Sequence, residues 1–477
     1  MVSVASITQG PMNTPSSSPR LAAASATSDG LVRALGPWQS LAMVVGTLIG
    51  TGIFFVSQEM IQEVHSIGWI LLAWVVGGFL SLAGALAYAE LGTLRPQAGG
   101  EYAYMRDGLG PLFGFLFGWG MFWIVRPVSV ATIGAGFALA AETLWPALQQ
   151  PVIGSSGVFT GLHLVAAGVI ALVTLINFYG VRHGGQVQAL FTALKLVLVA
   201  GLTSAAFAWG QGSWSHFSQQ LPASLGASGG FAAALVAALW AYDGWNDLTL
   251  AGSEIRDPGK TIPRAMIGGI AVVFVFYAGI NLAYLYVLTP AQIAASGNVA
   301  SSMVAHFWGS AGGALVAIAI MVSAFATLNS SILSGARVPF AMAHDGLFFK
   351  RLAHVHPQHR TPDVSLLIQA LFAMGFALAA SFKSLFTLTI FAEWLFYMLA
   401  IASLFVFRRR GERAPYASWG YPVLPGIFIA AAAVILVQTY WQNLAYSSLG
   451  LAIILAGVPA YFYFARRKRE GQTRMLS

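Results

Sequence analysis

VVGTLIGTGIFF, residues 45–56, places three glycines inside an apolar run that otherwise predicts a buried helix. Glycine in a helix interior costs about 1 kcal/mol relative to alanine, so three in one short stretch need a physical reason. The spacing of Gly46 and Gly50 is typical of close helix–helix contact, but that reason leaves Gly52 unexplained. The alternative is a helix that is interrupted near 49–53, because glycine tolerates backbone angles that helices do not use.

The composition indicates a membrane protein. Of the 477 residues, 57% are hydrophobic and only 8% are charged, whereas a soluble domain has about 25% charged residues. The mean hydropathy is +0.73. Residues 196–242, 265–336 and 414–465 contain no Asp, Glu, Lys or Arg, and each run holds one or two spans of about 20 residues. A soluble fold of this length is therefore excluded.

The hydropathy pattern predicts twelve membrane-spanning helices, arranged as five, five and two. The first five are expected near 38–60, 68–92, 111–141, 158–180 and 187–209. The next five are expected near 229–254, 265–289, 304–343, 364–381 and 384–407, and the last two near 419–441 and 443–465.

The basic residues predict the orientation of these spans. All but three of the 24 Lys and Arg residues fall in the two termini and in alternate connections between spans. The exceptions are Lys383 on the opposite side, and Arg126 and Lys195 within spans. Because basic loops stay in the cytosol, we expect a multi-pass protein of the cell membrane (inner or plasma) with both termini cytosolic. The net charge of +8 then reflects topology, and no nucleic-acid partner is expected.

We expect the chain to have five parts. Residues 1–33 are rich in Ser, Ala and Pro and predict a disordered cytosolic tail. Residues 34–209 hold the first five spans, residues 210–410 hold the next five, and residues 411–465 hold the last two. Residues 466–477 form a basic cytosolic tail.

A second irregular segment, ALWAYDGWNDL at 238–248, lies in the sixth predicted span. It carries Asp243 and Asp247, and an aspartate at the bilayer centre costs at least about 2.5 kcal/mol. The segment should therefore face a polar cavity or be unwound. Paired interrupted spans in corresponding positions of two repeats indicate the binding site of a transporter.

The two breaks suggest the chemistry of the substrate. N–H groups after the first break suit a carboxylate, and carbonyls freed at the breaks suit an ammonium group. A zwitterionic amino acid satisfies both at once. Trp240 and Trp245 would then form a lid or wall for its side chain.

The chain resembles the amino acid–polyamine–organocation (APC) superfamily, and within it the L-type amino acid transporter branch. The resemblance runs over roughly residues 38–410. The stretches that carry it are GTLIGTGIF (46–54), AYAELGTLRPQAGGEYAYM (87–105), IVRPVSVA (124–131), AYDGWNDLTLAGSEIRDPGKTIPRA (241–265) and GARVPFAMAHDGLFFKRLAHVHPQHRTP (335–362).

The resemblance implies an all-α integral membrane protein of the LeuT-type fold, with a 5+5 inverted repeat, two further helices and alternating-access transport. It implies that the backbone of 50–52 holds the substrate carboxylate, and that carbonyls near Ile49 and from Trp240 to Tyr242 hold the ammonium. The full expected binding set is Ile49, Gly50, Thr51, Gly52, Ile53, Trp240, Ala241, Tyr242, Asp243 and Trp245. Thr47, Asn246, Asn329 and Ser330 are candidates for the remaining lining, although such residues also bond neighbouring helices.

Lys195, in FTALKLVLV, is the most informative single residue. A lysine in mid-span costs about 2.5–3.5 kcal/mol, and this one lies too deep to reach the interface easily. In sodium-independent members of the family, a fifth-span lysine takes the place of a sodium ion between spans 1, 5 and 8. The resemblance implies that role for Lys195, and therefore transport without Na⁺.

Other charged residues leave alternatives open. Arg126, before a proline in the third span, is expected to pair with backbone carbonyls. Glu393 in the tenth span either faces the outer vestibule or carries a proton. Glu90, Glu101 and Arg95 are expected at the cytosolic mouth, either as an inner gate or as a solvated ion pair.

The sequence thus predicts a sodium-independent exchanger of neutral L-amino acids. Two alternatives of the same fold are a proton-coupled symporter and a carrier of cationic amino acids or polyamines; a transporter-like sensor and a membrane-embedded enzyme are others. The enzyme is disfavoured because no HExxH, GxSxG, nucleotide-binding loop or clustered His/Asp set occurs. No cofactor or metal is expected. Because the chain has no cysteine, the disulfide-linked heavy chain of the animal members is excluded.

Overall fold

The computed structural model describes residues 30–153, 159–220, 230–379 and 382–476. These residues are mostly helical, and they include one short hairpin of β1 (Pro151–Ile153) and β2 (Phe159–Thr160). Most of the expected N-terminal tail, 1–33, lies outside the described residues.

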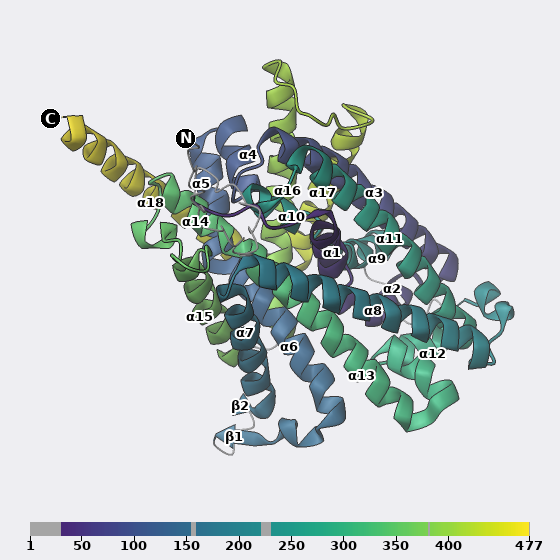
Figure 1. Cartoon of the computed structure of the whole chain (residues 1–477). Helices are drawn as coiled ribbons and strands as arrows, with labels where there is room; N and C mark the ends of the chain where they lie inside the picture. Colours follow the sequence, from purple (N-terminus) through teal and green to yellow (C-terminus); the bar gives the residue numbers. More distant parts are fainter. Residues whose placement is uncertain (1–29, 154–158, 221–229, 380–381, 477) are drawn as a thin grey trace, which may run out of the picture.

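The α-helices form one bundle in which α1 lies near the centre (Figure 1). In chain order they are α1 Pro37–Leu48, α2 Val56–Val64, α3 Ile67–Leu94, α4 Glu101–Gly108, α5 Pro111–Gly120, α6 Arg126–Leu144, α7 Gly161–Phe178, α8 Val181–Trp209, α9 Gly230–Ala241, α10 Asp247–Leu250, α11 Pro258–Val287, α12 Pro290–Ala295, α13 Val299–Gly335, α14 Arg337–His344, α15 Asp363–Ala379, α16 Phe382–Arg409, α17 Val423–Gln442 and α18 Leu444–Leu476.

Within the described residues, nine helical stretches are long and apolar enough to cross a membrane. Two shorter apolar helices, α9 and α15, accompany them. The chain is therefore a multi-pass membrane protein. The count of twelve spans stays a prediction, since it also requires α15 and the broken α1–α2 and α9–α10 pairs to cross.

The first span is interrupted where its glycines predicted it. Helix α1 ends at Leu48, and a single 3₁₀ turn, Gly52–Phe54, leads into α2. Close contact explains these glycines better than backbone freedom, because Gly46, Gly50 and Gly52 all lack a positive φ. A Cβ on Gly46 would lie 2.0 Å from the Gln188 side chain, so this glycine allows α8 to approach. A Cβ on Gly52 would lie 3.0 Å from the Trp240 ring.

The sixth predicted span is interrupted as well. Helix α9 ends at Ala241 and α10 begins at Asp247, with Gly244 between them at a φ of +104°. A Cβ on Gly244 would lie 2.3 Å from Cγ2 of Thr47 in α1. The two breaks therefore touch each other. They are enclosed by α8, α11 and α13, which all pack against α1.

Two expected boundaries differ in the structure. The predicted span 304–343 divides into α13, which ends at Gly335, and α14, which begins at Arg337. The last helix, α18, continues through the basic segment that was expected to be a tail and ends at Leu476. A high density of Arg and Lys marks the membrane boundary but does not stop a helix, because both residues have good helix propensity.

A substitution at Gly244 tests the close contact between the two breaks. The substitution Gly244→Ala should lower the free energy of unfolding, because strained backbone costs about 1–3 kcal/mol and overpacking adds about 1–3 kcal/mol. Thermal unfolding of the purified protein in detergent measures this loss. The matched control is Gly375→Ala in α15, where a new Cβ meets nothing within 4 Å and should not destabilise. Equal midpoints for the two variants would contradict the close contact.

Candidate functional site

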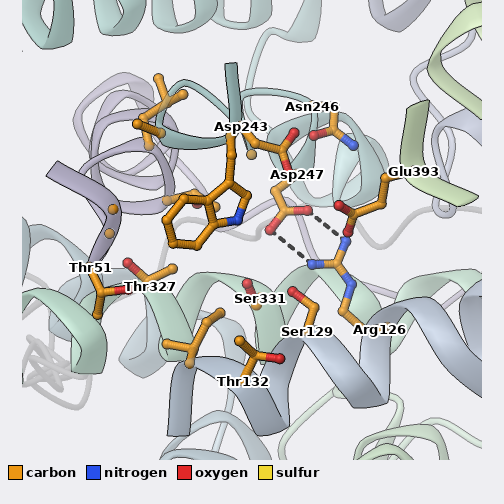
Figure 2. Close-up of a pocket in the computed structure, with 18 of the residues that line it drawn as sticks. Thr51, Arg126, Ser129, Thr132, Asp243, Asn246, Asp247, Thr327, Ser331 and Glu393 are labelled. Atoms are coloured by element: carbon orange, nitrogen blue, oxygen red, sulfur yellow. Dashed lines mark hydrogen bonds and ion pairs between the residues drawn. The ribbon is translucent and has the colours of Figure 1, made fainter. Parts of the chain in front are cut away.

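A pocket lies between the two breaks and is closed by α6, α13 and α16 (Figure 2). Hydroxyl, carboxyl and amide groups supply much of its wall, and Trp240 supplies the largest apolar face. Its lining is Thr47, Leu48, Gly50, Thr51, Gly52, Arg126, Ser129, Thr132, Ile133, Trp240, Ala241, Asp243, Gly244, Asn246, Asp247, Thr327, Ser331, Glu393 and Tyr397.

Part of the residue set expected from the sequence lies at this pocket. Thr47, Gly50, Thr51, Gly52, Trp240, Ala241, Asp243 and Asn246 line it. The pocket lining does not include Ile49, Ile53, Tyr242, Trp245, Asn329 and Ser330.

The two aromatic residues outside the lining are used in packing. Trp245 meets the ring of Tyr88 edge-on with centroids 4.8 Å apart. Tyr242 packs in the same way against Trp74, at 5.7 Å. Both side chains lie in the hydrophobic core.

Asn329 and Ser330 bond helices to one another. The Asn329 amide donates to the Gly184 carbonyl and to the Gln188 side chain, both at 2.9 Å. The Thr47 hydroxyl lies 2.6 Å from the Ser330 hydroxyl. All these groups are buried, so they fix α13 against α8 and α1.

Lys195 of α8 is fully buried beside the first break. Its ammonium group donates to the carbonyl oxygens of Gly46 at 2.8 Å, Ile49 at 2.5 Å and Ser323 of α13 at 3.1 Å. Three donors thus meet three acceptors, which is the full hydrogen-bonding capacity of an ammonium group. The Ser323 hydroxyl has one hydrogen to share between the carbonyl oxygens of Ile49, at 2.7 Å, and Gly50, at 2.9 Å.

The hydroxyl of Tyr277 in α11 connects the two breaks directly. It lies 2.6 Å from the carbonyl oxygen of Leu48 and 2.8 Å from that of Ala241, the last residues of α1 and α9. The carbonyls at both helix ends therefore share one donor. This side chain therefore helps to fix α1 beside α9.

The prediction that Arg126 pairs with backbone carbonyls is wrong. Its guanidinium binds the Asp247 carboxylate in bidentate geometry, with distances of 2.6 and 3.2 Å (Figure 2). The two side chains are only 8% and 3% exposed. Asp247 begins α10 and lies 121 residues further along the chain, which no local pattern relates to Arg126.

Two more carboxyls line the pocket. The Tyr397 hydroxyl lies 2.8 Å from Oδ1 of Asp243 and 3.2 Å from Oδ1 of Asn246. Glu393 reaches the pocket from α16, and its carboxyl contacts that of Asp243. Within the described residues, neither Asp243 nor Glu393 forms an ion pair, and no group of three or more His, Asp or Glu could hold a metal ion.

A sequence model of the amino acid permease family matches residues 35–462. The chain belongs to this family. It is 35% identical to the serine/threonine exchanger SteT of Bacillus subtilis, covering 92% of this chain and 98% of that protein. It is 30% identical to the b(0,+)-type amino acid transporter 1 of Mus musculus (92% and 89% covered). It is 31% identical to the large neutral amino acids transporter small subunit 2 of Homo sapiens (91% and 79% covered).

Sequence reasoning missed the hydroxyl wall of the permease pocket. Ser129 and Thr132 of α6 face Thr327 and Ser331 of α13 across it (Figure 2). Their spacings of three and four residues put each pair on one helix face, which is a signal that the sequence carried. Ser and Thr are common between packed membrane helices, so the signal is weak without the fold.

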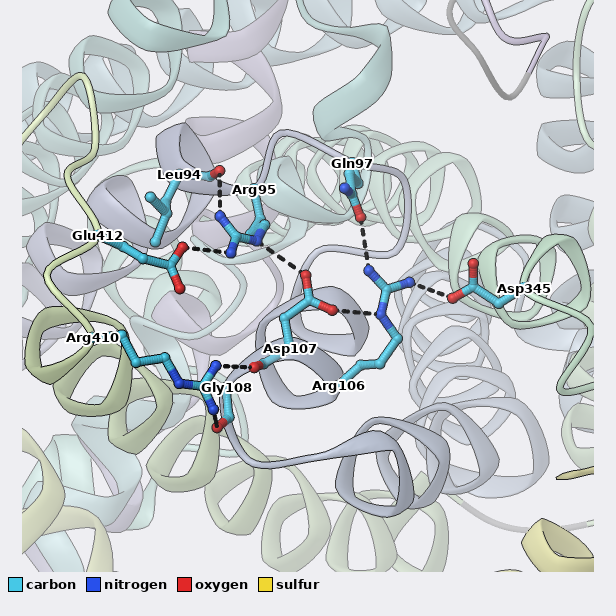
Figure 3. A network of polar contacts seen from close by, with 9 residues as sticks. All are labelled: Leu94, Arg95, Gln97, Arg106, Asp107, Gly108, Asp345, Arg410 and Glu412. Atoms are coloured by element: carbon cyan, nitrogen blue, oxygen red, sulfur yellow. Dashed lines mark hydrogen bonds and ion pairs between the residues drawn. The ribbon is translucent and has the colours of Figure 1, made fainter.

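The charged residues at the expected cytosolic mouth form separate sets in this permease. Glu90 binds Arg408 at 2.6 Å, and Arg95 binds Asp107 and Glu412 (Figure 3). Glu101 takes part in neither set. Its carboxylate oxygen Oε1 accepts from the side chain of Asn246 at 2.7 Å, beneath the pocket.

The Arg126–Asp247 pair should show the cost of an uncompensated buried charge. The substitution Arg126→Met leaves Asp247 alone and should lower the free energy of unfolding by about 3–5 kcal/mol. The double variant Arg126→Met/Asp247→Leu should recover much of that loss, since no charge is then buried. Thermal unfolding in detergent compares the two variants with the wild-type permease.

The matched control for this pair is Lys260→Met. Lys260 lies 3.6 Å from Asp257 in a pair whose side chains are 71% and 63% exposed. Exposed pairs are worth little, so this variant should unfold like the wild type. A double variant as unstable as Arg126→Met would contradict the compensation.

Proposed function

We propose that this permease is a sodium-independent exchanger of neutral L-amino acids that works by alternating access. The proposal includes twelve spans, of which ten form a 5+5 inverted repeat, and a cell-membrane location with both termini in the cytosol. One observation carries it. In the described part of the chain, the break between α1 and α2 and the break between α9 and α10 meet around one polar pocket. The similarity to transporters named for amino acids supports it.

The zwitterionic part of the substrate would bind at the first break. The N–H groups of Thr51 and Gly52 begin a new helical turn, so they suit the substrate carboxylate. The ammonium group needs a different acceptor from the expected Ile49 carbonyl, because Ile49 is outside the pocket lining and its carbonyl already accepts from Lys195. Gly50 lines the pocket, and its carbonyl shares only the single Ser323 hydroxyl hydrogen with Ile49, so a lone pair is left for the substrate. Carbonyls of 240–242 would complete the set.

The position of Lys195 supports the proposed absence of sodium coupling. Its ammonium group binds carbonyls of α1 and α13, the kind of oxygen ligands that a sodium ion would use. A cation that is covalently part of α8 occupies this place permanently. Transport then needs no added metal ion at this position.

A cationic amino acid is the second candidate substrate. The Asp243 and Glu393 carboxyls line the pocket, and no ion pair involves either of them within the described residues. A substrate with a positive side chain would compensate this charge. This observation keeps the carrier of cationic amino acids, and a proton-coupled symporter, as alternatives to be separated by experiment.

Uptake into proteoliposomes in sodium-free buffer tests the proposal. Labelled neutral and cationic amino acids are offered to vesicles with and without unlabelled amino acid inside, at matched pH. Uptake of neutral amino acids that requires internal amino acid supports exchange. Uptake into empty vesicles that follows an imposed pH gradient indicates proton-coupled symport instead, and uptake restricted to cationic amino acids supports the second candidate.

The substitution Lys195→Ala should reduce exchange at least about tenfold in sodium-free buffer, because three carbonyls lose charge-assisted hydrogen bonds worth about 1.5–3 kcal/mol each. Expression should fall much less than exchange. The control is Lys260→Ala, at a lysine that is 71% exposed. Partial recovery of Lys195→Ala on adding sodium chloride would support the cation role, and unchanged exchange would rule it out.

A further inference from the structure

Glu101 is a buried carboxyl that the transport mechanism above does not use. It begins α4, between the candidate spans α3 and α5–α6, and it is 0% exposed. Oε1 accepts from Nδ2 of Asn246 at 2.7 Å, whereas Oε2 has no hydrogen-bond partner among the described residues. Asn246 lines the pocket, so one side chain separates Glu101 from the substrate site.

Two buried phenols surround this carboxyl. Tyr88 of α3 and Tyr104 of α4 are both 0% exposed, and their hydroxyls also lack a partner within the described residues. The Tyr88 hydroxyl faces the Glu101 carboxyl. A buried polar group without a partner costs about 1–3 kcal/mol. A proton on Oε2 would allow Glu101 to donate a hydrogen bond to a phenol oxygen.

Among the residues that the structure describes, no cation forms an ion pair with Glu101. The guanidinium of Arg126 is nearby but holds Asp247 with both of its terminal nitrogens. The other ionisable groups that face Glu101 are Asp247 and the phenols of Tyr88, Tyr104 and Tyr397. An isolated buried carboxylate is costly, so the neutral acid is favoured here.

Burial raises the pKa of Glu101 to about 7. This effect outweighs the hydrogen bonds from Asn246 and from the Glu101 backbone N–H and the charge of Arg126, which all lower the pKa. A carboxyl in water titrates near pH 4.3. Contact with water would therefore release the proton at neutral pH.

We propose that Glu101 is a proton-binding site that holds a proton in the conformation described here and releases it to water when α4 separates from Asn246. The O–H bond of the neutral acid breaks, the proton goes to a water molecule, and the carboxylate remains. This inference rests on the proposed exchange function. It links the protonation of Glu101 to the pocket through the hydrogen bond from Asn246.

The direction of the pH effect follows from this assignment. The described conformation binds the proton more tightly than the open one, so falling pH favours it. Rising pH through about 7 favours the conformation in which Glu101 meets water. For one linked proton, the ratio of the two conformations changes by up to about tenfold per pH unit.

The experiment measures exchange in proteoliposomes with equal pH on both sides, from about 5.5 to 8.5. The wild type should show a pH profile with a midpoint near 7, and Glu101→Gln should show a flat profile, since an amide mimics the neutral acid. Glu142→Gln, at a carboxyl near the end of α6 that bonds Gln149, is the matched control and should keep the wild-type profile.

A second measurement detects the proton directly. The heat of substrate binding to the wild type at pH 7 is recorded in two buffers of different ionisation enthalpy. Different heats for the wild type and equal heats for Glu101→Gln show that binding moves a proton at Glu101. Equal wild-type heats, or a wild-type pH profile in Glu101→Gln, would overturn the inference while exchange itself persists. Failure of the wild type to exchange any amino acid would overturn the proposed function.

Discussion

The ammonium group of Lys195 stabilises the break after α1, and the pocket is built around this break. The break in α1 frees carbonyls that would be orphaned in an apolar bundle, where each unsatisfied group costs several kcal/mol. Lys195 satisfies those of Gly46 and Ile49 and reaches Ser323 in α13 with its third donor. One side chain of α8 thus allows α1 to be irregular and fixes it to the helix across the pocket.

The second break is tied to the first by one tyrosine hydroxyl and by a close packing contact. Tyr277 bonds the last carbonyls of α1 and α9, and Gly244 fits against Thr47 where a Cβ would collide. Neither broken helix can shift by more than a small amount without disturbing the other. A conformational change at the pocket therefore has to move α1 and α9 together, or first break the bonds of Tyr277.

The sequence predicted the features that arise from single residues in an unfavourable place. Three glycines in an apolar run indicated the first break, and a lysine in mid-span indicated a buried cation site. It did not predict pairings that depend on three-dimensional packing. Arg126 and Asp247 are both recognisable as misplaced charges, but nothing local says that they meet. Trp245 was expected to form a lid or wall of the pocket, yet its ring packs against Tyr88 in the core.

A covalently attached cation also limits how such a permease can be driven. In the proposed mechanism Lys195 cannot leave with the substrate, so no metal-ion gradient does work through this position. The remaining sources of free energy are the gradient of a second amino acid, which gives exchange, and a proton carried on a buried acid. The described structure offers Glu101 for the latter, uncompensated by any cation and one amide away from the pocket. With Lys195 and Glu101 in these roles, the permease would exchange amino acids without sodium, and protons would change the rate of exchange.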